Sequence, residues 1–195
     1  RRRDDGTVYV RQRGELTDVA TRISDRLAYW AAKTPDATFL ADRGPDGAWR
    51  RLTYGAAFEA CRRLGAALLA HGLGPERPLL ILSGNDLDHA RLALAALYVG
   101  VPYAPVSEAY SLVSTDFGKL RDIVSLLEPG LVFAADGERF AHAIAVAVPA
   151  GVPLLVARNP VRGAQRLEEA AMTAPTPAVD AAAAAVGPGA IAKLL

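Results

Sequence analysis

The run Leu79-Leu80-Ile81-Leu82 is apolar at each of its positions. A strand with one face in water alternates apolar and polar residues, because successive side chains point to opposite faces of a sheet. A strand without this alternation needs cover on both faces, which is typical of parallel sheets packed between helices. Leu131–Ala135 repeats the pattern. These two runs therefore predict a parallel sheet with helices on both sides.

The segments around these two runs alternate between helix and strand patterns. Thr53 can cap a long helix over Tyr54–His71, and Gly72 follows as a C-terminal stop. Further along the chain we expect a helix at Asp88–Val99, an edge strand with two prolines at Val101–Val106, a helix from Thr115 to Leu127, a helix at Glu138–Val148 and a strand at Val152–Ala157. This order predicts an α/β fold: a mostly parallel sheet flanked by helices, with right-handed crossovers.

A smaller antiparallel element is expected before this sheet. Ser24 can cap a first helix, which ends before Pro35. Ala37–Ala41 and Ala48–Leu52 then flank residues 42–47, which are rich in Gly, Pro and Asp. Two short strands around such a turn predict a small β-hairpin.

The chain divides by composition into three parts. Residues 1–23 are polar and irregular and form a predicted N-terminal arm, and residues 24–171 form the α/β subdomain. Residues 172–195 are interpreted as a linker followed by the start of a further strand. Met172–Pro188 is rich in Ala, Pro, Thr and Gly, which favours a linker or surface segment, although a single helical turn within it stays open. Ala190–Leu195 has the pattern of a strand.

Overall composition excludes several classes of protein. The chain of 195 residues is 51% hydrophobic and 22% charged, and its net charge of +1 argues against a dedicated nucleic-acid binder. A single cysteine, Cys61, excludes an internal disulfide and a zinc site of several cysteines, and is compatible with a reducing compartment. The longest apolar stretch, Ala141–Ala157, is interrupted by proline and glycine, whereas a membrane span needs about 20 apolar residues. We therefore expect a cytoplasmic protein without nucleic-acid or membrane partners.

A search for known chemical motifs assigns no catalytic, cofactor-binding or metal-binding residue. Gly72-Leu73-Gly74 follows a helix and lacks the third glycine of a dinucleotide fingerprint, and Gly118-Lys119 lacks the other residues of a phosphate-binding P-loop. Asp116-Phe117-Gly118 spells a kinase motif without the catalytic loop that should precede it. The three histidines have no metal-ligand spacing.

One loop is a candidate binding site on the substrate side. Ligands of open α/β sheets collect beyond the carboxyl ends of the strands. Ser83 and Asn85 follow the first buried strand, and the next helix carries His89. The alternative interpretation is structural, with Asn85 or Asp86 capping that helix.

Four segments carry a family resemblance over about Ser24–Ala135. They are Arg51-Leu52-Thr53-Tyr54 before the long helix, Gly72-Leu73-Gly74-Pro75-Glu76-Arg77-Pro78 before the first core strand, Ile81-Leu82-Ser83-Gly84-Asn85 at its end, and the stretch from Leu94 to Val106 that contains Gly100-Val101-Pro102-Tyr103-Ala104-Pro105. In this order they resemble the adenylate-forming superfamily, which includes acyl- and aryl-CoA synthetases, firefly luciferase and the adenylation domains of peptide synthetases. Glu76-Arg77 departs from the Gly-Asp of the family pattern.

Smaller marks are similar to one branch of that superfamily, the feruloyl-CoA synthetases. They are Asp25-Arg26-Leu27, Trp30-Ala31, Pro35-Asp36, Trp49-Arg50 and Ala109-Tyr110-Ser111-Leu112. This closer resemblance implies an aromatic, hydroxycinnamate-type carboxylic acid as substrate.

The resemblance implies an N-terminal portion of an acid–CoA ligase that uses ATP, Mg²⁺ and coenzyme A. The family's Ser/Thr/Gly-rich loop for the triphosphate would follow the strand that Ile191–Leu195 begins, so this chain alone is expected to be inactive and to bind none of these cofactors. Its expected partner is the remaining, C-terminal part of the enzyme, and exposed apolar surface makes self-association an expectation. Two alternatives stay open: a small cofactor-binding α/β domain, and a non-enzymatic binding or scaffold module.

Overall fold

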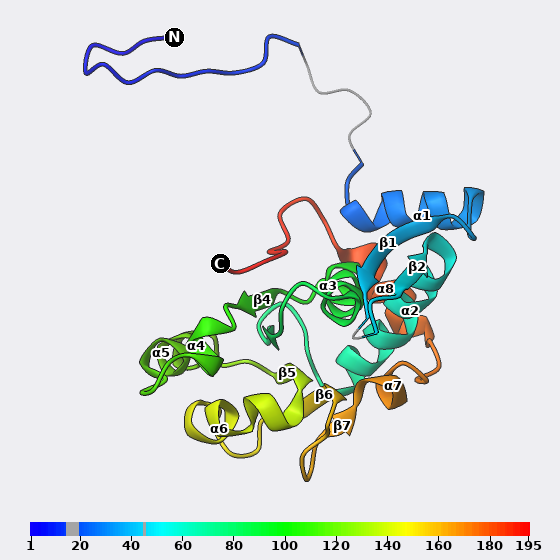
Figure 1. Ribbon diagram of the computed structural model, residues 1–195. Coiled ribbons are helices and arrows are strands. Elements are labelled where there is room, and N and C mark those ends of the chain that lie inside the picture. The colour runs from blue at the N-terminus through cyan, green and yellow to red at the C-terminus, as the bar shows by residue number, and fades with distance from the viewer. Residues whose placement is uncertain (15–19, 45) are drawn as a thin grey trace.

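The computed structural model describes residues 1–14, 20–44 and 46–195, and within these ranges a five-stranded sheet and a two-stranded hairpin form the β structure (Figure 1). The large sheet has the order β4-β3-β5-β6-β7, and all of its strand pairs are parallel. Its strands are β3 (Leu79–Leu82), β4 (Tyr103–Val106), β5 (Leu131–Asp136), β6 (Leu154–Arg158) and β7 (Gln165–Arg166). The predicted α/β class with a mostly parallel sheet is confirmed.

Helices cover both faces of this sheet. They are α2 (Tyr54–Ala70), α3 (Leu87–Val99), α7 (Leu167–Ala170) and α8 (Pro177–Ala185) on one side, and α4 (Ala109–Leu112), α5 (Gly118–Leu127) and α6 (Gly137–Ala147) on the other. Each side chain of β3 has zero exposure, which is why its sequence shows no alternation. Leu79 and Ile81 pack toward the first set of helices, and Leu80 and Leu82 pack toward the second.

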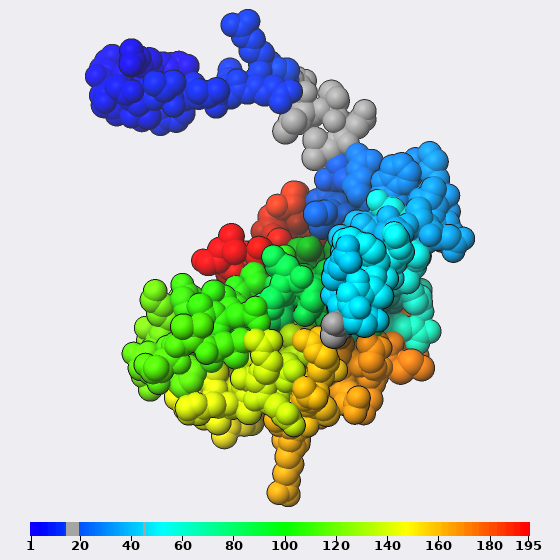
Figure 2. Space-filling view, in the orientation of Figure 1, coloured from blue at the N-terminus to red at the C-terminus, as the bar shows by residue number. Residues whose placement is uncertain are grey.

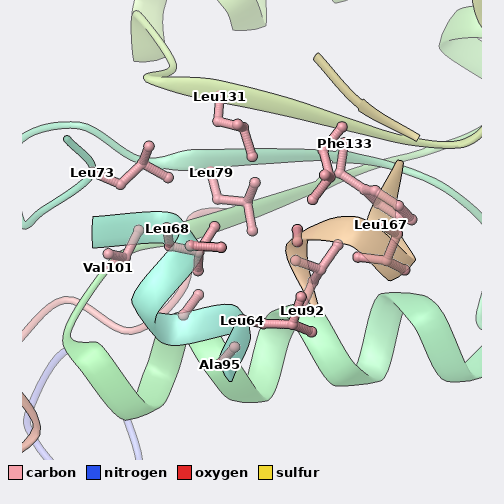
Figure 3. Close-up of a cluster of buried hydrophobic side chains, with 14 of the residues drawn as sticks. Leu64, Leu68, Leu73, Leu79, Leu92, Ala95, Val101, Leu131, Phe133 and Leu167 are labelled. Carbon is pink, nitrogen blue, oxygen red and sulfur yellow. The ribbon is translucent and has the colours of Figure 1, made fainter. Parts of the chain in front are cut away.

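The first face holds the larger hydrophobic core. Figure 3 shows leucines of α2 and α3, Leu64, Leu68 and Leu92, gathered against strand residues such as Leu79 and Phe133. All five of these side chains are fully buried. Because burial of one leucine or phenylalanine contributes about 1.5–3 kcal/mol, this layer is a main source of stability.

The hairpin lies beside the first helical layer and consists of β1 (Thr38–Arg43) and β2 (Trp49–Thr53). It confirms the predicted antiparallel pair, although both strands begin one residue later than the predicted ranges 37–41 and 48–52, and they end at Arg43 and Thr53. Pro45, in the predicted turn, lies outside the described residues. Helix α1 (Ile23–Lys33) packs over α2, and Leu27, Leu52 and the Cys61 side chain form a small separate core there.

Local differences from the predicted elements have clear physical causes. Ser24 does not cap α1: the cap position is Arg22, whose backbone N–H donates to Asp25 Oδ2 (3.2 Å), and Ser24 is buried inside the helix. Helix α5 begins at Gly118 rather than near Thr115, because Phe117 has a left-handed backbone (φ 53°) that interrupts the helix.

The C-terminal region contains more structure than its composition indicated. Helix α8 lies inside the predicted linker, and its residues Val179 and Ala183 are buried against α2 and α3. Beyond it, Leu194 N–H donates to Tyr103 O (2.9 Å) and Tyr103 N–H to Ala192 O (3.3 Å). The predicted terminal strand is thus represented by one parallel bridge, Tyr103 to Lys193, beside the edge strand β4.

The N-terminal residues extend away from the rest of the molecule (Figure 2). Residues 15–19 of the predicted arm, 1–23, lie outside the described residues. The proposed boundaries of the arm, the subdomain at 24–171 and the segment at 172–195 stay a prediction.

Gly137 provides a test of how tightly the loop after β6 packs on the first residue of α6. A Cβ at this position would lie 2.4 Å from Asn159 O and 3.1 Å from Val161 N, and backbone atoms cannot move aside cheaply. We expect Gly137→Ala to lower the free energy of unfolding by about 1–3 kcal/mol in denaturant titrations. Gly118→Ala is the matched control, since Gly118 also begins a helix but its Cβ would meet only the Asp116 side chain at 3.4 Å. Equal stability of the two variants would contradict the close contact.

Candidate functional site

The order of the strands places a topological switch point at the carboxyl edge of the sheet. From β3 the chain continues into α3 on one face, and from the neighbouring strand β5 it continues into α6 on the opposite face. The two connections therefore diverge beyond the ends of adjacent strands. Ligands of open α/β sheets bind at such a switch point, which lies here beyond Leu82, the last residue of β3, and its partner Ala134 on β5.

The loop after β3 brings two of the three sequence-predicted residues together. Ser83 is buried, and its Oγ lies 2.9 Å from His89 Nδ1. Asp86 accepts a hydrogen bond from His89 N–H (2.8 Å), so it is the N-cap of α3 and the structural alternative is confirmed for this residue. Asn85 is exposed and stays apart from the pair.

The hydrogen bonds of His89 define its chemistry. Nδ1 lies 3.1 Å from Gly84 O, and a carbonyl only accepts, so this contact requires the proton on Nδ1. Burial lowers the pKa of His89, and Lys193 acts in the same direction, while the Gly84 contact and Asp86 oppose the shift. The neutral ring then presents its lone pair at Nε2. Because the ring nitrogen beside Ser83 carries the proton, the pair can orient and hydrogen-bond a ligand but does not activate the serine as a nucleophile.

Polar groups at the ends of the neighbouring strands were missed by the sequence analysis. Asp136, the last residue of β5, accepts from Arg139 N–H (3.1 Å) and from Asn159 Nδ2 (2.9 Å). A Cβ on Gly84 would lie 3.0 Å from Glu108 Oε2, so the loop after β4 approaches the loop after β3. Asp136 could have been found from the sequence, because it is a polar residue directly between a buried strand and a helix. The approach of Glu108 to Gly84 depends on the sheet order.

The hairpin is anchored to the same edge. Asp42 forms an ion pair with Arg50 and accepts a hydrogen bond from Leu87 N–H (3.2 Å), the first residue of α3. On the other flank Arg91 bridges Asp88 (3.2 Å) and Glu168 (2.8 Å), joining α3 to α7. The helix that carries His89 is thus fixed from both sides.

Other candidate chemistries can be examined residue by residue. Burial raises the pKa of the Cys61 thiol to about 12, so the side chain stays a protonated, inert thiol. In the described ranges, no three or more His, Cys, Asp or Glu side chains cluster so that they could hold a metal ion. Nor does any helix there have the length and apolar character needed to cross a membrane.

The lowered pKa of His89 predicts a pH dependence of stability. Since the unfolded chain binds this proton more tightly than the folded chain, His89 costs no stability above its ordinary pKa of 6.5 and destabilises the fold as the pH falls below it. We expect His89→Gln to lose less stability than the unsubstituted chain between about pH 6.5 and pH 5 in denaturant titrations. Ser125→Ala, which removes an exposed hydroxyl on α5, is the control and should keep the original slope. Parallel curves for His89→Gln and the unsubstituted chain would refute the assignment.

Comparisons with known proteins agree with this architecture. The sequence model of a family described as "AMP-binding enzyme" matches residues 27–192. A search of curated proteins gave no significant match. Among solved structures, a protein of Rhodopseudomonas palustris described as a long-chain-fatty-acid CoA ligase is 22% identical with a TM-score of 0.64, covering 79% of this chain and 37% of its own.

Two further structures are similar in fold. The fatty acyl-adenylate ligase of L. pneumophila, solved with acyl adenylate and pyrophosphate, is 19% identical with a TM-score of 0.63, covering 90% of this chain and 28% of its own. VinN is 20% identical with a TM-score of 0.63, covering 89% of this chain and 41% of its own. The chain therefore spans well under half the length of these three proteins.

The family match includes all four segments on which the resemblance to the adenylate-forming superfamily rests, and it extends past β5 through α8. The chain belongs to the AMP-binding enzyme family, within the adenylate-forming superfamily.

Proposed function

We propose that this chain is part of an ATP-dependent acid–CoA ligase. The observation that carries the proposal is the family match over residues 27–192. The similar structures support it, because one is described as a CoA ligase and another holds an acyl adenylate with pyrophosphate. In the proposed reaction the carboxylate oxygen of the acid attacks the α-phosphorus of ATP and displaces pyrophosphate. The thiolate of coenzyme A then attacks the acyl carbonyl and displaces AMP.

The chain is proposed to supply the scaffold of this enzyme and one wall of its site. Phosphoryl chemistry of this kind needs a cradle for the triphosphate and a Mg²⁺ ion. We assign both to residues of the enzyme outside this chain. Support comes from the partial coverage of the similar ligases, 28–41% of their length, and from the missing P-loop pattern in this sequence.

An aromatic acid of the hydroxycinnamate type is the proposed substrate. Support comes from the short marks shared with the feruloyl-CoA synthetase branch, such as Trp49-Arg50 and Ala109-Tyr110-Ser111-Leu112. We place Ser83 and His89 on the substrate side of the site, where the neutral imidazole can accept a hydrogen bond. Association with the rest of the enzyme, self-association and a cytoplasmic location stay predictions.

The first test is adenylate formation. We expect purified 1–195 to release no pyrophosphate with ferulate, ATP and Mg²⁺, because the proposed phosphate cradle lies elsewhere. The protein translated from the full reading frame should release pyrophosphate, and ferulate should be preferred to a long-chain saturated acid. Turnover by 1–195 would refute the division of roles, and a silent full-length protein would refute the ligase proposal. A preference for the saturated acid would refute only the aromatic assignment.

The second test concerns the carboxyl-edge residues in that full-length protein. Loss of one hydrogen bond to the substrate costs about 0.5–1.5 kcal/mol, so Ser83→Ala or His89→Gln should each lower kcat/KM about three- to tenfold. Matched controls are Ser125→Ala, which is exposed on α5, and His142→Gln. A purely structural role would lower the unfolding free energy while leaving kcat/KM of the folded enzyme unchanged. That result would remove Ser83 and His89 from the site.

A further inference from the structure

A concave site lies at the opposite, amino end of β4. Its cavity has a volume of about 370 Å³, at the lower end of the range that holds small ligands. The start of α1, the end of α3, the first residue of β4 and the C-terminal segment form its walls. Tyr103 pairs with Leu79, the first residue of β3, so the cavity lies at the other end of the strands from Ser83, although the charge of Lys193 also acts on the pKa of His89.

The cavity has a mostly apolar lining with a few polar groups, which come from the start of α1 and from the C-terminal segment. Its apolar and aromatic residues are Leu97, Val101, Tyr103, Val186 and Ile191. Thr21, Ser24, Arg22 and Lys193 add polar groups. An apolar body with a small number of converging polar groups is the usual composition of a small-molecule site.

The two cations of the lining differ in whether a carboxylate compensates their charge. Arg22 forms an ion pair with Asp25 (2.7 Å) and donates to the carbonyl of Ala183 near the end of α8, so its charge is compensated. Lys193 Nζ lies 5.9 Å from the centroid of the Tyr103 ring. Within the described part of the chain Lys193 makes no ion pair. One ammonium group beside an apolar cavity is therefore left to pair with an anion.

We propose that this cavity binds an amphipathic monocarboxylate, with its apolar body between α3 and the C-terminal segment and its carboxylate on Lys193. A single uncompensated ammonium matches a single negative charge, and the apolar lining excludes a strongly hydrated polyanion. The inference is independent of the acid–CoA ligase proposal, since it needs neither ATP nor residues outside this chain.

The C-terminal segment is suited to act as the closing wall. It leaves α8 beside α3 and ends near β4 (Figure 1), and it is attached at that end by the bridge between Tyr103 and Lys193. Ile191 is 61% exposed, so most of its side chain is accessible to a molecule in the cavity. A bound molecule that contacts both Ile191 and Lys193 would hold the segment against β4.

The test is a binding titration of the 195-residue chain with ferulate, an aromatic monocarboxylate, in the absence of ATP and Mg²⁺. We expect saturable binding with one ferulate per chain, and about tenfold weaker binding of the uncharged methyl ferulate, as for loss of a charge-assisted hydrogen bond. Lys193→Gln should weaken ferulate about tenfold and leave methyl ferulate unchanged. Ile191→Trp, which fills the cavity from its exposed wall, should weaken both ligands.

Lys119→Gln is the matched control, because Lys119 also lies over a tyrosine ring, 5.1 Å from the Tyr110 centroid, on α5. It should bind ferulate as the unsubstituted chain does. A second readout is hydrogen exchange at the Leu194 amide, which ferulate should slow through the bond to Tyr103 O. The proposal is overturned if ferulate binding does not saturate, if the ester binds as tightly as the acid, or if Lys193→Gln binds as the unsubstituted chain does. These outcomes are separate from adenylate formation, so either proposal can fail alone.

Discussion

Burial of β3 on both faces is the constraint on which the rest of this fold depends. Its four residues have no exposed surface, and alternate side chains contact the α2 and α3 layer and the α5 and α6 layer. The strand pairs with β4 on one side and β5 on the other. Because both faces and both edges of β3 are occupied, the positions of six neighbouring elements, four helices and two strands, depend on one segment of the chain.

The same arrangement determines where polar chemistry can occur. Strand interiors are apolar, so polar side chains collect where strands end, as Ser83, Asp136 and Asn159 do. The divergence of α3 and α6 from adjacent strands places a switch point there, which is where ligands of open α/β sheets bind. The hairpin contributes through Asp42, which accepts a hydrogen bond from Leu87 N–H at the start of α3, 45 residues away in the sequence. A peripheral element thus orients the helix that carries His89.

The sequence of the edge strand β4 limits further strand pairing at this side of the sheet. Tyr103 directs its N–H and carbonyl outward, toward Ala192 and Leu194. The next residue with this orientation is Pro105, which has no N–H to offer. A neighbouring strand can therefore form only part of a regular ladder, which discourages pairing with unrelated edges. The C-terminal segment uses the one available position, and in doing so it becomes a wall of the cavity at the amino end.

The sequence by itself determined the α/β class, the hairpin, most helices and the family, because these depend on local periodicity, turn residues and short ordered motifs. Leu79–Leu82 required cover on both faces whatever lay around it, and the cap of the following helix could be narrowed to Asn85 or Asp86 from their position. Tertiary structure alone decided that α8 docks through Val179, that Glu108 approaches Gly84, and that Lys193 lies beside Tyr103. Each of these depends on which strands are neighbours and on contacts between distant segments. Local sequence patterns carry no information on those distances, because the pairing is set by the packing of the whole sheet.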